Sequence, residues 1–354
     1  MKEPPVAITN APVRTHPRPS CPVCGSAGEI RYSRLRDRLW QVAPGDWTMR
    51  SCPSCGCLWI DPVPDERDVG RLYENYYTHG SGNVDGRFGW LQRGWDKLAD
   101  AYVRARLGYP DGVGRQRLAY LAWVAYLHPG APDEILYRVL HLPAPSPGQR
   151  VLDVGCGNGD LLARLQARGW DAVGIDLDET AVRQAKSRGL DARVGQLADQ
   201  HFPDASFDAI TVSHVIEHTA EPGLVLKECA RILRPGGRLV VLTPNPRSWG
   251  HARFGEAWVG LDPPRHLVLL NRDNLRSLAD RAGLRILALR TGHRAIREQW
   301  WLSERIKKIG VADALALRLR WQLRWMPAQY LVRIVRPFRP DAGEELILIA
   351  TRGA

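Results

Sequence analysis

A short apolar segment that runs directly into three alternating glycines constrains the fold of this 354-residue chain more than any other feature. Residues 150–154 are typical of a buried strand, Gly155, Gly157 and Gly159 follow at two-residue spacing, and a helical pattern begins at residue 161. Glycines let a loop bend sharply and let a ligand lie against its backbone. The N–H groups at the start of the next helix favour an anionic or polar ligand. We therefore predict a ligand-binding loop between a strand and a helix.

The chain after residue 150 alternates strand patterns with helical patterns. Candidate strands cover residues 150–154, 171–175, 191–194, 207–212, 237–243, 284–290 and 345–351. Such alternation is typical of a doubly wound, mostly parallel sheet. The stretch 291–344 is too long for a loop and predicts an inserted helical element. We predict an α/β fold with a Rossmann-like, seven-stranded sheet over residues 146–354.

Two acidic residues flank the glycine segment at positions that suit a nucleoside ligand. Asp153 stands two residues before the first glycine, and Asp176 ends the next candidate strand. A carboxylate at that strand end can accept hydrogen bonds from both hydroxyls of a ribose. The main alternative is an NAD-binding domain, but the G-x-G-x-G spacing disfavours it, because dinucleotide loops have the spacing G-x-G-x-x-G.

The run Asp153-Val154-Gly155-Cys156-Gly157-Asn158-Gly159 resembles motif I of the class I S-adenosylmethionine-dependent methyltransferases. Residues 207–218, 233–239 and 243–245 agree with that family in order and spacing. The resemblance implies S-adenosylmethionine as cofactor, with Asp176 at the ribose and Leu177 at the adenine. The cofactor-binding residues that it implies are Asp153, Gly155, Cys156, Gly157, Gly159, Asp176, Leu177, Gln196, Leu197 and His214.

Two near-copies of a cysteine motif stand near the N-terminus, C-P-V-C-G from residue 21 and C-P-S-C-G from residue 52. Paired cysteines two residues apart are typical of a zinc knuckle, and four thiolates make a closed, structural tetrahedral site. We expect one zinc ion on Cys21, Cys24, Cys52 and Cys55, with Cys57 packed nearby. Metal binding would supply folding energy to so small a segment. This cysteine pattern also favours a reducing compartment over a disulfide framework.

The composition and the motifs divide the chain into four predicted parts. Residues 1–20 are polar and proline-rich and predict a disordered lead, followed by a zinc ribbon over 21–60 and a helical connecting segment over 61–145. The methyltransferase domain occupies 146–354 and contains the basic helical insertion at 291–344. The order of ribbon and methyltransferase resembles a bacterial family of ribbon-bearing methyltransferases. We expect a cytoplasmic protein, since the chain shows neither a signal core nor ~20 consecutive apolar residues.

Methyl transfer needs an aligned acceptor and a group that removes its proton. His218 and His266 are the candidate bases, since they follow the fourth and fifth strands.

The pattern H-x-x-E-H over 214–218 also occurs in a class of zinc peptidases, which carry it on a regular helix rather than after a strand. The run resembles the Glu-x-x-Glu-His segment that holds a divalent ion in ubiquinone-pathway O-methyltransferases. The sequence therefore allows two interpretations of His214, Glu217 and His218: they bind a metal ion, or they have a purely structural role.

Most of the net charge of +11 lies near the C-terminus. Residues 285–340 hold 13 Arg or Lys and 3 Asp or Glu, with tryptophans among them. An apolar helical stripe runs from Val311 to Ile334, and an amphipathic helix packed on its own domain would explain it. The functional interpretation is peripheral contact of residues 300–340 with an anionic membrane surface. Nucleic acid is the third option.

We expect a methyltransferase that acts on a small-molecule or lipid-linked acceptor, with oxygen as the acceptor atom. Saccharides are among the candidate acceptors. This class of acceptor rests on family resemblance alone. One alternative is an RNA methyltransferase, which the basic charge and the ribbon favour. The fourth strand ends in Ser213-His214, without the Asn/Asp-Pro-Pro-aromatic run typical of base-amine methylation. A second alternative is a non-catalytic cofactor-binding scaffold, which the intact glycine loop and Asp176 disfavour.

Overall fold

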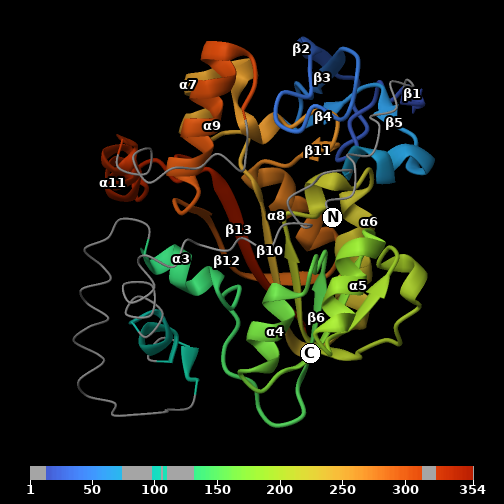
Figure 1. Ribbon diagram of the computed structural model, residues 1–354, viewed down its shortest axis with the longest axis vertical. Helices are drawn as coiled ribbons and strands as arrows, with labels where there is room; N and C mark the ends of the chain where they lie inside the picture. Colours follow the sequence, from blue (N-terminus) through green and yellow to red (C-terminus); the bar gives the residue numbers. More distant parts are fainter. Residues whose placement is uncertain (1–12, 74–97, 105–106, 110–130, 313–323, 354) are drawn as a thin grey trace, which may run out of the picture.

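The computed structural model describes residues 13–73, 98–104, 107–109, 131–312 and 324–353. Its centre is a sheet of seven strands with hydrophobic layers on both faces (Figure 1). A smaller sheet belongs to the cysteine-bearing part, residues 21–60, which we call the ribbon. In Figure 1 the ribbon is blue and lies near the end of the central sheet that carries α7 (Trp249–Phe254) and α9 (Ile296–Ile309).

The central sheet has the strand order β12-β13-β10-β9-β6-β7-β8. These strands are β6 (Arg150–Val154), β7 (Asp171–Asp176), β8 (Asp191–Val194), β9 (Phe207–Ser213), β10 (Leu233–Pro244), β12 (Leu284–Gly292) and β13 (Glu345–Arg352). β13 is antiparallel to β10 and β12, and the other pairs are parallel. The predicted α/β fold class is confirmed. The strands lie where the sequence placed them, except that β10 begins earlier, at Leu233.

Helices cover the two faces of the sheet. They are α3 (Ala131–Tyr137), α4 (Asp160–Gln166), α5 (Glu179–Ser187), α6 (Pro222–Ile232), α7, α8 (Arg272–Arg281), α9 and α11 (Met326–Val335), with the 3-10 helices η1 (Glu66–Tyr73), η4 (Ala198–Gln200), η5 (Ile216–His218), η6 (Gly255–Ala257) and η7 (Val259–Leu261). Leu152 and Val241 belong to the layer that contains α6 and α8, whereas Val151 and Val240 belong to the layer of α3 and α4. Strands buried on both faces read as continuous apolar runs, which is why the sequence located them.

The sheet of the ribbon contains a strand from far along the chain. β2 (Glu29–Leu35), β3 (Trp47–Ser51) and β4 (Leu58–Ile60) are antiparallel, and β11 (Val268–Leu269) pairs with β4 as the fourth strand. The side chain of Trp59 in β4 is fully buried. The ribbon is therefore joined to the α/β domain by backbone hydrogen bonds as well as by packing.

Residues 13–20 are ordered, although the sequence predicted disorder throughout residues 1–20. β1 (Thr15–His16) pairs with β5 (Val63–Pro64), and the guanidinium of Arg14 donates two hydrogen bonds to a carboxylate in η1. The prediction is wrong for this segment, because its polar groups find partners elsewhere in the chain that composition does not reveal. The first twelve residues lie outside the described part of the chain.

The basic insertion contributes core residues. Trp300 and Trp301 of α9 are 6% and 1% exposed, and the indole of Trp300 donates a hydrogen bond to Glu344 at 2.7 Å. These two tryptophans thus belong to the core, because α9 packs its apolar side on α7 and η7. Residues 313–323, which hold much of the predicted apolar stripe, lie outside the described residues. Within the described residues, none of the helices has both the length and the apolar character needed to cross a bilayer.

A buried cation joins the ribbon to the α/β domain. The Arg265 guanidinium, with no exposed side-chain surface, lies 2.6 Å from both Asp37 Oδ1 and Asp262 Oδ1. Asp37 also accepts hydrogen bonds from the backbone N–H groups of Trp40, Val42 and Ala43. A buried charge is stable only with close partners whose remaining lone pairs are also satisfied, which is the case here. No pattern in the sequence marks Arg265 as internal.

The N-cap of α8 provides a second contact between the ribbon and the α/β domain. Asn271 accepts hydrogen bonds from the N–H groups of Asp273 and Asn274, and its Nδ2 donates to the carbonyl of Cys55 at 2.8 Å.

We predict that Asn271→Ala lowers the free energy of unfolding by about 2 kcal/mol, since it removes a cap worth ~1 kcal/mol and a buried hydrogen bond worth ~1 kcal/mol. The matched variant Asn271→Ser keeps a capping oxygen but loses the donor to the Cys55 carbonyl, so it should cost about 1 kcal/mol. Urea unfolding followed by circular dichroism compares the two variants. An Asn271→Ser variant as stable as the wild-type chain would contradict a contribution of the Asn271–Cys55 contact.

Candidate active site

The glycine loop joins β6 to α4 at the carboxyl end of the parallel strands. Gly155 and Gly159 have φ angles of 77° and 81°, which other residues rarely adopt. A Cβ at Gly155 would lie 2.2 Å from Cγ2 of Val215, and one at Gly159 would lie 2.5 Å from Cδ1 of Leu190. Both glycines are therefore required by backbone conformation and by close packing, and the loop turns as the sequence predicted.

The two predicted carboxylates occupy different places. Asp176, at the end of β7, accepts hydrogen bonds from the N–H of Gly157 at 2.7 Å and of Asp178 at 2.9 Å, so it braces the glycine loop. Burial raises its pKa above the ordinary value. Asp153 is 3% exposed and accepts a hydrogen bond from the hydroxyl of Thr211. Burial raises the pKa of Asp153 to about 7, as expected for a carboxylate inside the domain beneath the loop.

The other predicted cofactor residues lie around this loop with different exposures. Leu177 is 55% exposed immediately after β7, where its apolar side chain can cover a planar ring. Gln196 is exposed after β8, whereas Leu197 is 7% exposed. Cys156 is also 7% exposed, and its N–H donates to the carbonyl of Ile175. Since β6, β7 and β8 are adjacent, these residues follow neighbouring strand ends.

His214 follows β9 and lies between two carboxylates. Its Nδ1 is 3.3 Å from Oε1 of Glu217, and its Nε2 is 2.9 Å from Oε1 of Glu345. Burial alone would lower the pKa of His214, but the hydrogen bonds to the two carboxylates outweigh it and raise the pKa well above the ordinary value. Arg294 also contacts Glu345, at 2.7 Å. An imidazolium and a guanidinium thus balance two buried carboxylates.

Sequence reasoning missed Glu345 and Arg294. Their only local signal is position: Glu345 begins β13, and Arg294 follows the end of β12, so antiparallel pairing brings both to the edge where β9 ends. Because the two residues are far from His214 in sequence, no spacing pattern connects them with it.

The two predicted bases, His218 and His266, lie together and are called the ring pair below. Their ring centroids are 4.8 Å apart. His218 Nδ1 donates to the carbonyl of Arg265 at 3.0 Å, and His266 Nδ1 donates to the carbonyl of Gly260 at 2.8 Å. Burial lowers the pKa of His218 to about 4, which keeps its ring neutral near pH 7.

Glu217 and the ring pair also make a set that could hold a metal ion, because one ligand atom from each lies within 4.8 Å of the others. His214 is outside this set, since both of its ring nitrogens face carboxylates. The set that the sequence left open, His214 with Glu217 and His218, is thus not the one that the structure assembles. The peptidase alternative also fails, because Ile216–His218 is a 3-10 turn after a strand and not part of a regular helix.

Four cysteines of the ribbon converge as predicted. Sγ atoms of Cys21 and Cys55 are 3.6 Å apart, and those of Cys24 and Cys52 are 3.4 Å apart. A tetrahedral zinc site with Zn–S bonds of about 2.3 Å places its sulfurs about 3.8 Å apart, so the four residues fit the ion. The fully buried Cys57 is not a member of this set.

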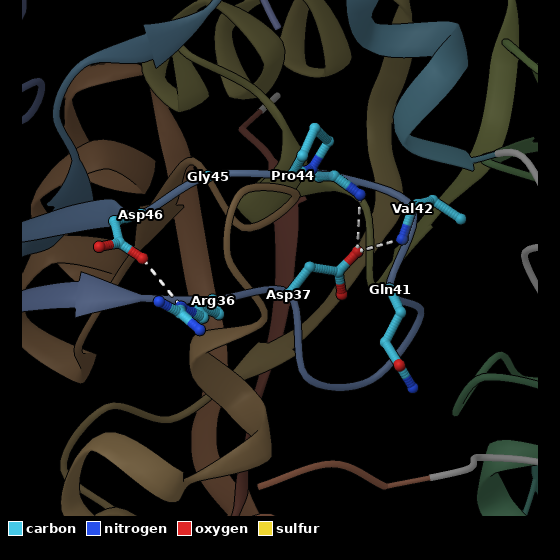
Figure 2. Close-up of a pocket in the computed structure, with 8 residues that line it drawn as sticks. Arg36, Asp37, Gln41, Val42, Pro44, Gly45 and Asp46 are labelled. Carbon is cyan, nitrogen blue, oxygen red and sulfur yellow. Dashed lines mark hydrogen bonds and ion pairs between the residues drawn. The ribbon is translucent and has the colours of Figure 1, made fainter. Parts of the chain in front are cut away.

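A hollow of about 300 Å³ lies in the ribbon loop between β2 and β3 and does not coincide with the glycine loop. Figure 2 shows Asp37 at its wall, with a carboxylate oxygen turned toward the backbone of the loop, and Arg36 paired with Asp46 across the strands. The lining residues are Arg36, Asp37, Gln41, Val42, Ala43, Pro44, Gly45 and Asp46. None of them is a predicted cofactor or catalytic residue.

Comparison with known proteins adds the family. The model of a methyltransferase domain matches residues 125–289. The chain is 36% identical over 159 residues to a Mycolicibacterium smegmatis protein named "Probable S-adenosylmethionine-dependent methyltransferase", covering 43% of this chain and 58% of that protein. It is 32% identical over 157 residues to a ubiquinone biosynthesis O-methyltransferase of Idiomarina loihiensis, covering 40% of this chain and 64% of that protein.

The chain thus spans about three fifths of the length of these two relatives. A solved S-adenosylmethionine-dependent methyltransferase from Mesorhizobium loti is 18% identical, with a TM-score of 0.45, over 62% of this chain and 97% of that one. The family match, the strand order and the glycine loop agree, and the chain carries a methyltransferase domain.

Proposed function

We propose that this chain transfers the methyl group of S-adenosylmethionine to an oxygen atom of a small-molecule or lipid-linked acceptor. The observation that carries the proposal is the glycine loop braced by Asp176, with Gly155 close against Val215, three residues before His218 of the ring pair. Oxygen as the acceptor atom is supported by the relative named a ubiquinone biosynthesis O-methyltransferase. A saccharide acceptor stays within this class on family resemblance alone.

The residues around the loop fit the cofactor. Asp176 would accept the ribose hydroxyls, Leu177 and Leu197 would border the adenine, and the glycine backbone would lie against the methionine moiety. Bound S-adenosylmethionine supplies an activated methyl group. What remains for the chain is to align the acceptor oxygen and to remove its proton.

The ring pair is the part of the site suited to that proton. Nδ1 of each ring donates to a backbone carbonyl, so Nε2 is the nitrogen that would take the proton of the acceptor. The same rings together with Glu217 can instead bind a divalent ion, which would lower the pKa of an acceptor hydroxyl. One carboxylate and two imidazoles suit zinc, iron or manganese better than magnesium.

We predict that S-adenosylmethionine binds the purified chain and that Asp176→Ala weakens binding by about 1.5–3 kcal/mol, the scale of a hydrogen bond to a charged group. Isothermal titration calorimetry measures both affinities. Asp171→Ala is the control, since Asp171 is an exposed residue at the opposite end of β7 and should leave the affinity unchanged. Wild-type chain without measurable affinity would refute the proposed function.

We predict one structural zinc ion on Cys21, Cys24, Cys52 and Cys55. Elemental analysis should give about one zinc per chain, and Cys52→Ser should lose the metal together with thermal stability. Cys57→Ala is the matched control, because that thiol lies beside the cluster but outside it. Retention of zinc and stability by the Cys52 variant, or loss of zinc from the Cys57 variant, would contradict the assignment.

We also propose that the basic C-terminal part brings the enzyme to an anionic surface where a lipid-linked acceptor resides. Supporting this, α11 and the turn after it expose apolar side chains: Leu331 is 51% exposed, Ile334 66% and Phe338 83%. Lys307 and Lys308 are exposed at the end of α9. Each basic side chain near an anionic bilayer contributes ~1 kcal/mol of attraction.

We expect the chain to sediment with anionic but not with neutral liposomes, and less at high salt, because the attraction fades within a Debye length. The double variant Ile334→Ser/Phe338→Ser should sediment less than wild type. Leu224→Ser is the control, as Leu224 is 63% exposed on α6. Absence of liposome binding combined with salt-sensitive RNA binding would contradict the proposal and favour an RNA methyltransferase.

A further inference from the structure

The ribbon contacts the segment that bears His266 of the ring pair by backbone hydrogen bonds. The N–H of Ile60 in β4 donates to the carbonyl of Leu267, and the N–H of Leu267 donates to the carbonyl of Glu217 at 2.7 Å. One residue thus connects a strand of the ribbon with the turn that carries His218. Pairing of β11 with β4 continues this contact by two further residues.

A second route runs through side chains. Two oxygens of Asp37, in the ribbon, bind the Arg265 guanidinium at 2.6 and 2.9 Å. The carbonyl of Arg265 accepts the hydrogen bond from Nδ1 of His218, and His266 is the next residue in the chain. Figure 2 shows that the carboxylate of Asp37 is itself held by N–H groups of its own loop. A carboxylate outside the α/β domain is thus linked to the ring of His218 through one residue, Arg265.

A third set of contacts reaches the two cysteine knuckles. Asn271 and Asn274 both donate to the carbonyl of Cys55, and Arg281 donates to the carbonyl of Val23. These residues belong to α8 and its N-cap, which begins two residues after β11. The segment from Asp262 to Asn274 is consequently fixed to the ribbon at both ends. The glycine loop has none of these contacts among the described residues.

We propose that the ribbon is the positioning module of the catalytic side of this active site, and that Asp37 is a positioning residue that fixes the ring pair through Arg265. This inference rests on the proposed function of the ring pair. It separates two tasks: the α/β domain binds the cofactor by itself, whereas the acceptor side is assembled only when the metal-bearing ribbon is folded against residues 262–274. A ribbon that served only to recognise acceptors would not need contacts with the backbone around both histidines.

The test is the chemical reactivity of single histidines in the full chain. Diethyl pyrocarbonate modifies accessible imidazoles, and mass spectrometry of peptides reports each site. Asp37→Asn should raise the modification rates of His218 and His266 at least tenfold, because Arg265 loses its charged partner in the ribbon. Zinc content and S-adenosylmethionine affinity should stay at wild-type values. His293, which is 3% exposed and pairs with Asp133 away from the ribbon, should stay protected.

Asp46→Asn is the matched control, since Asp46 lies in the same loop but pairs with Arg36 at the surface. It should leave all rates unchanged. If Asp37→Asn is recovered unfolded, wild-type chain treated with a zinc chelator replaces it, with the same expected modification rates at the three histidines and an unchanged S-adenosylmethionine affinity. Unchanged rates at His218 and His266, or a parallel rise at His293, would overturn the inference. Failure of wild-type chain to bind S-adenosylmethionine would instead refute the proposed function. The reactivity pattern of the histidines would still decide the inference about the ribbon.

Discussion

The guanidinium of Arg265 is a charge that the folded chain cannot bury without partners from two separate regions. Asp262, three residues earlier, supplies one carboxylate, and Asp37, 228 residues away in sequence, supplies the other. Removing one partner of a buried ion pair costs about 3–5 kcal/mol, so this cluster strongly favours the state in which the ribbon is docked. The cis peptide Pro263-Pro264 and His266 lie in the same short segment, and the ring of His218 packs on that of His266. The proposed acceptor side thus depends on an ion pair between residues that are 228 positions apart.

Charge balance also shapes the part of the site next to the ring pair. His214 and Arg294 carry positive charge, and Glu217 and Glu345 carry negative charge, so the cluster is neutral while each member is paired. Paired charges of this kind can remain in a weakly polar interior, whereas a single unpaired one would change its protonation. The ring pair beside it stays uncharged for the complementary reason: burial disfavours the imidazolium form of His218. Two neighbouring histidines, His214 and His218, therefore hold different protonation states because of their surroundings alone.

Local patterns in the sequence were enough to locate the strands of the central sheet, the glycine loop and the four thiols, since each depends on residues close in sequence. The ring pair was identified from strand ends in the same way. Glu345, Arg294 and the Arg265–Asp37 pair could not be found, because each depends on a contact between distant segments that no periodicity records. The burial of Trp300 and Trp301 could not be predicted for a related reason: an aromatic beside arginines looks the same in sequence whether its helix faces solvent or packs on α7. The strand β11 has only two residues, too few for any pattern.

The most direct test of the account is a crystal structure of the chain with S-adenosylhomocysteine, the demethylated product of the cofactor. In that structure we expect the ribose hydroxyls within hydrogen-bond distance of Asp176, the adenine beside Leu177, and the sulfur turned toward the side of the site where His218 and His266 lie. A product molecule bound away from the glycine loop, or a sulfur facing away from the ring pair, would contradict it.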